Sequence, residues 1–213
     1  MARAHDRRQT LGEELANAIS HGAGFIAALA LAPPLIAEAA RRPGAAPLVG
    51  ASVFAATVAL LYLGSTLYHA FPHGRAKHVF HVIERSAIFL LIAGTYTPLA
   101  LGVLRGTWGW TLIAVVWGLA VLGVLLTTLG RARHPVLSLV LYVGMGWLIV
   151  VAIDPLRARL PVEGLRWLVA GGLAYTLGVG FYAAKRVPYA HLVWHLFVLL
   201  GTACHYMVVR FYA

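Results

Sequence analysis

Long apolar runs separated by short breaks constrain the fold of this chain most. Each run is close to the roughly 20 residues that an α-helix needs to cross the hydrocarbon core of a bilayer. Hydrophobic residues make up 61% of the chain and charged residues only 11%, whereas about a quarter of a typical soluble domain is charged. Runs of this length are therefore expected to be membrane-spanning helices. The sequence therefore predicts an all-α, polytopic membrane protein.

Seven spans fit into the 213 residues, with proline, glycine and charged residues at the breaks. The expected spans cover about residues 15–37, 48–69, 81–102, 108–129, 135–153, 165–184 and 189–209. Pro98 is expected to kink or loosen the third span. Residues 1–12 form a polar arm that we expect to be mobile. Because no separate soluble domain fits, residues 1–213 are predicted to form a single seven-transmembrane-helix bundle.

The net charge of +10 comes from Lys and Arg residues scattered between the apolar runs. Nucleic-acid binding would need a basic stripe, so we predict no nucleic-acid partner. Loop charges that face anionic membrane lipids explain the pattern better. The arm and the loops on its side carry slightly more Lys and Arg than the opposite side. By the positive-inside tendency, we expect a multi-pass protein of the cell membrane with a cytoplasmic N-terminus.

Two histidines, His191 and His195, open the last apolar run. A spacing of four residues places both imidazoles on one helix face, where they can bind one metal ion together. The alternative is that each is a hydrogen-bonded interior residue. Ionisable groups inside a membrane span are costly and usually functional, which favours the metal site. A single cysteine, Cys204, excludes an intramolecular disulfide and a cysteine-rich metal cage.

Helix parity brings further candidates to the same side of the membrane. In a seven-span chain, the end of the second span lies beside the starts of the third and the seventh, so His69 and Glu84 can share the depth of the histidine pair. His21, near the start of the first span, falls on that side too. His205 lies about 15 Å further along the last helix and is expected outside the site.

Three imidazoles with room for a fourth ligand match a catalytic zinc site better than a closed structural one. Water in the open position would become a nucleophile near neutral pH. Ser65, one helical turn before His69, can bond a ligand or that water, or else serve helix packing as a small residue. Glu84 can hold the water or act as general base, although pairing with Arg85 is a competing role. The histidines of the second-to-third turn, His73, His78 and His81, are expected to be solvated or interfacial.

Several motifs together resemble the hemolysin III family. They are Ser65-x3-His69, the run from Ser86 to Pro98, and His191-x3-His195, with Glu13 to Asn17 and Ser20-His21 before the first span. This family belongs to the progestin and adipoQ receptor group, which is similar in turn to alkaline ceramidases. The resemblance implies a seven-helix bundle with its N-terminus inside, and zinc held by His69, His191 and His195. It also implies a nearby serine and aspartate, and here Glu84 stands at the aspartate position.

Two classes of function remain open from the sequence. The first is a zinc-dependent hydrolase that cleaves an amide or ester bond in a lipid substrate, as a ceramidase does, with Glu84 and Ser65 as catalytic residues. The second is a non-enzymatic membrane-homeostasis sensor, receptor-like or cytolytic protein in which zinc is structural. The apolar character of the spans argues against a wide aqueous pore, because a pore needs a polar lining.

Overall fold

The computed structural model describes residue 7, residues 9–130 and residues 135–213. Seven helical rods stand side by side, and no strand occurs in this part of the chain. Besides the last rod, four rods consist of a single α-helix: α1 (Leu11–Ala40), α2 (Ala46–Ala70), α4 (Gly106–Thr128) and α7 (Val162–Ala183). The rod of α8 (Ala190–Tyr212) returns along α7 and ends the chain.

The remaining two rods change helix type along their length. The helix α3 (Arg75–Pro98) stops being α-helical at Pro98 and continues as the π-helical segment η1 (Leu99–Leu104). A rod made of α5 (Pro135–Trp147), the 3₁₀ segment η2 (Leu148–Ala152) and α6 (Ile153–Arg159) lies between α4 and α7. Tyr96 of α3 stabilises the change from α-helix to 3₁₀-helix in this rod. Its hydroxyl donates to the carbonyl of Met145 (2.8 Å) and accepts from the amide of Ile149 (2.8 Å).

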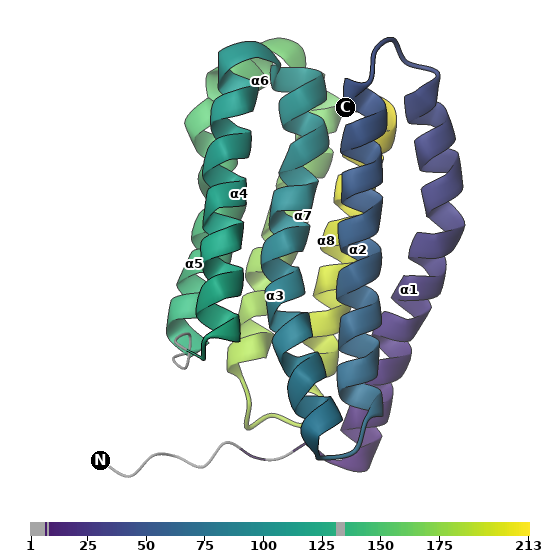
Figure 1. The fold of residues 1–213 in the computed structure, drawn as a ribbon, viewed down its shortest axis with the longest axis vertical. Helices are drawn as coiled ribbons and strands as arrows, with labels where there is room; N and C mark the ends of the chain where they lie inside the picture. The colour runs from purple at the N-terminus through teal and green to yellow at the C-terminus, as the bar shows by residue number, and fades with distance from the viewer. Residues whose placement is uncertain (1–6, 8, 131–134) are drawn as a thin grey trace.

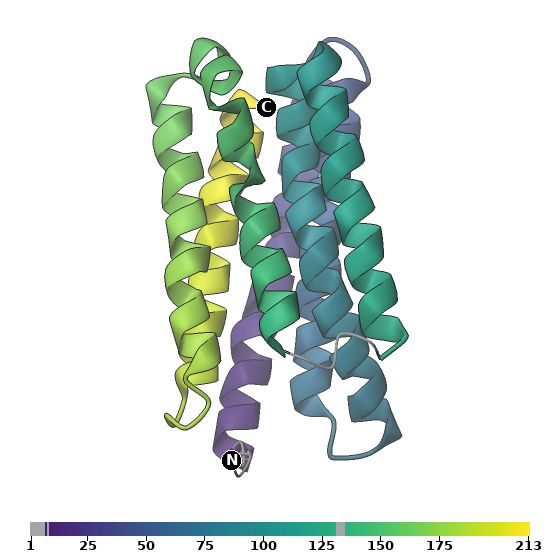
Figure 2. The ribbon, with the colours of Figure 1, turned by 90° about the vertical axis from the view of Figure 1, so that its left-hand side faces the viewer.

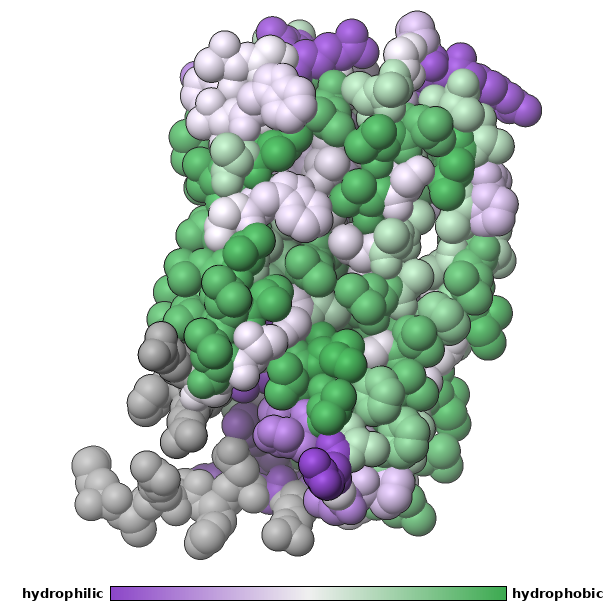
Figure 3. Space-filling model, in the orientation of Figure 1, coloured by the Kyte–Doolittle hydropathy of each residue, from purple (hydrophilic) through white to green (hydrophobic). Residues whose placement is uncertain are grey.

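Six of the rods are long and apolar enough to cross a membrane. The seventh rod, α7, has 22 residues, is not among these six and runs alongside α8. Large apolar side chains face outward, among them Ile26, Leu122 and Leu177. The face in Figure 3 is mostly apolar along its height, with hydrophilic residues gathered towards the two ends. A soluble bundle would bury such side chains, whereas lipid accommodates them. The chain is an all-α, polytopic membrane protein.

Helix bounds differ in places from the spans expected from hydropathy. The third rod begins at Arg75, six residues before residue 81, because the polar turn from Arg75 to Phe80 is helical as well. The fifth rod continues to Arg159 beyond residue 153, because Asp154 and Pro155 lie in the first turn of α6, where a missing proline N–H costs nothing. Hydropathy identifies the apolar part of each span, and the helices extend beyond it into polar residues.

The start of α1 is fixed by a capping box. The Thr10 hydroxyl accepts from the amide of Glu13 (3.3 Å), and the Glu13 carboxylate accepts from the amide of Thr10 (2.8 Å). Arg7 is ion-paired with Glu13, and the Gln9 side chain accepts from the Asn17 amide (2.8 Å). Residues 1–6 and 8 of the predicted arm lie outside the described residues, while its last two residues belong to α1.

Close contact between α2 and α3 aligns the polar residues of both helices. A Cβ atom at Gly94 would lie 2.1 Å from Oγ1 of Thr57, so only glycine permits this approach. A Cβ at Gly50 would lie 2.6 Å from Cα of Pro98. The two helices therefore pack nearly backbone to backbone, and α1 and α8 complete the polar end of the bundle where α2 ends and the other three begin.

Candidate metal centre

Four potential metal ligands converge at this end of the bundle. His69 comes from the last turn of α2, Glu84 from α3, and His191 and His195 from the first turns of α8. Each offers one ligand atom, and these atoms all lie within 4.8 Å of one another. The parity of the helices had placed these residues at one depth, and the rotation of each helix about its axis turns them towards a common point.

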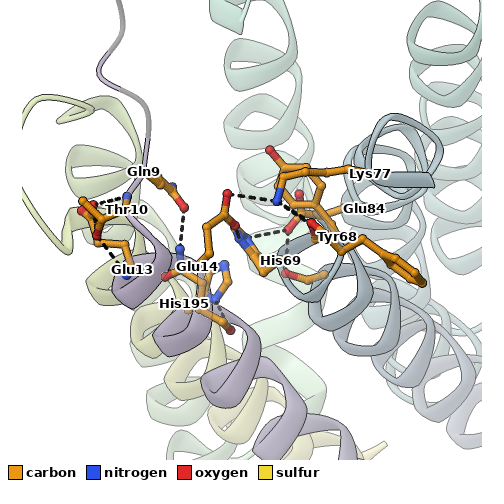
Figure 4. Close-up of polar contacts among 12 residues, drawn as sticks. Gln9, Thr10, Glu13, Glu14, Tyr68, His69, Lys77, Glu84 and His195 are labelled. Atoms are coloured by element: carbon orange, nitrogen blue, oxygen red, sulfur yellow. Dashed lines mark hydrogen bonds and ion pairs between the residues drawn. The ribbon is translucent and has the colours of Figure 1, made fainter. Parts of the chain in front are cut away.

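His69 is held from outside the cluster by a carboxylate. Its Nδ1 lies 2.7 Å from Oε2 of Glu14 on α1, and Lys77 of α3 contacts the other oxygen of Glu14 at 2.9 Å (Figure 4). Lys77 also donates to the carbonyls of Tyr68 and Phe71 at the end of α2. With Nδ1 engaged in this way, the Nε2 atom of His69 is the one that faces the cluster. A carboxylate behind a histidine is the usual support for a metal-binding imidazole.

His195 is oriented by two oxygen atoms of α1. Its Nδ1 lies 3.0 Å from the hydroxyl of Ser20 and 3.3 Å from the carbonyl of Asn17. The carbonyl can only accept, so Nδ1 carries the hydrogen and Nε2 keeps a free lone pair. The ring of His21 stacks on that of His195 with 3.6 Å between centroids and 6° between planes. The stack fixes the plane of the imidazole as well as its tautomer.

The inner nitrogens fit a metal ion. Nε2 of His69 and Nε2 of His191 are buried and have no hydrogen-bond partner among the described residues. Buried polar atoms are nearly always paired, and leaving one unpaired is costly. A metal ion among the rings would satisfy both nitrogens at once. The donor set of three imidazoles and a carboxylate is one that zinc accepts.

Ser65 and Glu84 form a buried pair between α2 and α3. Ser65 has no exposed surface, and its hydroxyl donates to Oε1 of Glu84 at 2.6 Å. The same Oε1 lies 3.7 Å from Nε2 of His69. Arg85, the competing partner for Glu84, instead donates to the hydroxyl of Ser138 on α5 (2.8 Å). The Glu84 carboxylate therefore faces the cluster and accepts a hydrogen bond from the neutral Ser65 hydroxyl.

The structure gives supporting roles to four residues that were not candidate site residues: Glu14, Asn17, Ser20 and Lys77. The first three lie in the stretches before the first span that carried the family resemblance, whereas nothing in the sequence analysis pointed to Lys77. His21 lies on the expected side and stacks on a candidate ligand, whereas His205 lies buried in the middle of α8. His73 and His78 are exposed and line an open surface pocket together with half-buried His81.

The sequence as a whole matches known proteins along nearly its full length. The family model described as haemolysin-III related matches residues 9–206. The chain belongs to the haemolysin-III related family. It is 42% identical to the hemolysin-3 homolog of Bacillus subtilis (strain 168) over 203 residues, which are 95% of each chain. It is 43% identical to hemolysin-3 of Bacillus cereus over 204 residues, 96% of this chain and 93% of that relative.

A more distant relative extends the family to animals. The human monocyte to macrophage differentiation factor is 29% identical over 171 residues, 76% of this chain and 69% of the human protein. This match supports the grouping of the family with the progestin and adipoQ receptors. No solved structure matches the chain. The haemolysin-III chain described here is thus a multi-pass membrane protein with a His/Glu cluster that could hold a metal ion.

Proposed function

We propose that this haemolysin-III protein is a zinc-dependent hydrolase of lipid amide or ester bonds. The observation that carries the proposal is the position of Glu84, a buried carboxylate that lies among three converging imidazoles and is held by the hydroxyl of Ser65. A structural zinc site needs only ligands. Hydrolysis also needs a group that moves protons beside the reacting atoms. The membrane setting gives access to substrates with acyl chains.

His69, His191 and His195 would hold the ion through their inner nitrogens. When bound, zinc lowers the pKa of water towards neutrality and polarises a carbonyl group. The Glu84 carboxylate would accept a proton from the attacking water and deliver it to the leaving amine or alcohol. In the present arrangement the Ser65 hydroxyl donates to Glu84, so it orients the base, and an additional role at the oxyanion requires it to turn towards the substrate. Lys77 and Glu14 keep His69 in place.

The test is fatty-acid release from ceramide-like and phospholipid substrates by purified, zinc-loaded protein. Glu84→Gln should retain zinc and lower the rate of release by about 10²- to 10⁴-fold, the usual effect of losing a general acid–base group. His191→Ala should abolish both zinc binding and release. Glu38 of α1, whose side chain is 45% exposed, supplies a matched control, since Glu38→Gln should change neither. If zinc-loaded wild type released no fatty acid from any of these substrates, the proposal would be wrong.

A second function is favoured by the same carboxylate if it binds the ion directly. Glu84 would then complete four protein ligands, the arrangement of a structural zinc site. The ion would join α2, α3 and α8 in a membrane-homeostasis sensor, a receptor-like protein or a cytolytic protein. The last of these is the role that the name hemolysin-3 gives to the Bacillus cereus relative. In this case Glu84→Gln weakens zinc retention and lowers the thermal midpoint, and wild type releases no fatty acid.

We also place the protein in the cell membrane with the N-terminus in the cytoplasm, which puts the metal centre towards the cytoplasmic side. Cysteines introduced near Arg7 and near Arg210 lie at opposite ends of the bundle. In intact cells a membrane-impermeant thiol reagent should label the second and spare the first. The reverse labelling would invert the orientation.

A further inference from the structure

A second group of histidines lies at the turn between α2 and α3, outside the candidate metal centre. They line an open surface pocket of about 240 Å³. The residues around this pocket are Tyr68, His73, Gly74, Lys77, His78 and His81. His73 and His78 are exposed and His81 is half-buried, so the imidazoles extend from the surface of the bundle towards its interior. The proposed hydrolysis uses none of the three.

One aromatic side chain joins the pocket to the metal centre. The ring of His81 stacks on that of Tyr68, with 5.0 Å between centroids and 29° between planes. The same Tyr68 ring contacts the ring of the candidate ligand His69, with 4.6 Å between centroids. Tyr68 is half-buried. An ion bound at His81 therefore has a single, partly exposed side chain between it and His69.

Lys77 gives the pocket a positive charge, but its hydrogens are already used. A lysine ammonium group has three N–H donors. Those of Lys77 contact Oε1 of Glu14 (2.9 Å), the carbonyl of Tyr68 (3.0 Å) and the carbonyl of Phe71 (3.3 Å). No donor is left for a phosphate or a carboxylate, and the charge is paired with Glu14. Neutral imidazoles instead offer lone pairs, which suit a metal cation.

His78 and His81 have the spacing of a two-histidine metal site. They are three residues apart on α3, so they are neighbours on one helix face with about 5–6 Å between Cβ atoms. Two imidazoles leave the other coordination positions of the ion to water. Such a site holds zinc more weakly than the centre, where four potential ligands converge. A weak site at the surface can release its ion again, which a route of entry requires.

The other sides of the centre are closed. His195 is covered by α1, through contacts with Ser20 and Asn17, and by the stacked ring of His21. Ser65, on the inner side, has no exposed surface. The pocket, in contrast, opens to the surface close to His69.

We propose that His78 and His81 form an entrance site for zinc, which binds the ion at the surface of the bundle and passes it beyond Tyr68 to the centre by exchange of ligands. His69 and the histidines of α8 replace the imidazoles of the pocket, and no covalent bond of the protein changes. The inference rests on the zinc centre of the proposed function but not on hydrolysis. Capture makes the second step a transfer within one molecule, which speeds loading and leaves the final affinity unchanged.

The first experiment measures how fast zinc-free, full-length protein in detergent takes up added zinc, with a weak fluorescent zinc indicator in a stopped-flow instrument. The double variant His78→Gln and His81→Gln removes both ligands without adding charge. It should slow uptake about tenfold, the lower end of what a raised local ion concentration provides. Its equilibrium affinity should remain that of wild type, which also shows that the fold is intact. Arg75→Gln is the control, because Arg75 is exposed in the same turn and does not line the pocket.

The second experiment looks for the entrance site in protein that lacks the centre. The double variant His191→Ala and His195→Ala should lose the tightly bound zinc ion and keep a weakly bound one, measured by isothermal titration calorimetry. Adding His78→Gln and His81→Gln to it should remove the weak binding as well.

Three results overturn the proposal. They are equal uptake rates in wild type and in the variant without His78 and His81, equal slowing by Arg75→Gln, and weak binding that survives the loss of the two pocket histidines. Failure of the zinc centre itself is told apart from these, because wild type then holds no zinc tightly at equilibrium. That result overturns the entrance role together with the proposed function, whereas slow uptake with unchanged affinity supports the entrance role.

Discussion

The first turns of α8 and its middle surround buried histidines in opposite ways. His195 has two oxygen partners behind its ring and other imidazoles in front of it. His205 lies on the wall of an apolar cavity, and its Nδ1 atom is buried without a hydrogen-bond partner among the described residues. Both are buried in the same helix of the same membrane protein. The difference teaches that burial alone does not make a histidine a candidate metal ligand: several potential ligand atoms must also converge on one point, as they do around His195 and do not around His205.

The largest expected effect breaks the metal centre itself. His69→Ala, His191→Ala or His195→Ala should each lower zinc affinity by more than about a hundredfold, above the usual cost of losing an outer-shell partner. Zinc per protein is measured by mass spectrometry after dialysis against a chelator. His205→Ala is the matched control on α8 and should keep its zinc. If it lost zinc as readily as His195→Ala, the contrast between the two parts of α8 would disappear.

A smaller effect is expected from the carboxylate behind His69. Glu14→Gln removes a charged partner at 2.7 Å and should weaken zinc binding by about 10- to 100-fold. Competition with a chromophoric chelator measures the affinity. Glu38→Gln changes a half-buried carboxylate of the same helix, away from the cluster, and should leave the affinity unaltered. An unchanged affinity in Glu14→Gln would mean that packing alone orients His69.

The apolar part of α8 is tested by two adjacent glycines of α7. Gly171→Ala forces a Cβ to within 2.7 Å of Nε2 of His205, whereas the Cβ of Gly172→Ala meets only Trp147 at 3.9 Å. The first change should lower the free energy of unfolding by about 1–3 kcal/mol through overpacking, and the second should be neutral or slightly stabilising. Thermal unfolding in detergent compares them. Zinc content should stay the same in both, and a loss in Gly171→Ala would couple the two regions.

The smallest effect is expected at Ser20. Ser20→Ala removes one neutral contact to Nδ1 of His195 while the carbonyl of Asn17 remains, so zinc affinity should fall by no more than about tenfold. Ser86→Ala is the control, because the buried Ser86 hydroxyl has no hydrogen-bond partner within the part of the chain that the structure describes. Chelator competition measures both variants. A loss in Ser20→Ala equal to that in Glu14→Gln would show that the hydroxyl, and not the charge on α1, dominates the outer contacts.

Part of the candidate site was predictable before any coordinates. Spacing put His191 and His195 on one helix face, and the number of spans put His69 and Glu84 on the same side of the membrane. Which way Glu84 points was not predictable, since Arg85 next to it was an equally good partner by sequence. The close packing of α2 on α3 decided this by placing the Ser65 hydroxyl beside the carboxylate.

Outer partners were harder to predict for a physical reason. Glu14, Asn17 and Ser20 lie far from His69 and His195 in sequence, and they meet them only through the rotation of α1 against α2 and α8. That rotation depends on many side-chain contacts between helices at once. None of these contacts leaves a recognisable pattern in the sequence around the residues that make it. His21 shows the same limit: parity placed it on the correct side, and packing stacked it on His195.

By itself the sequence determined that this chain is an all-α membrane protein and that its metal-binding residue types gather at one end. Those properties follow from hydropathy and from the alternating direction of successive spans, which are features of the chain read in one dimension. The tertiary structure decided which nitrogen of each imidazole faces the cluster, and that His205 faces an apolar cavity. Both depend on how helices rotate and pack about their axes, which only the sum of all side-chain contacts fixes.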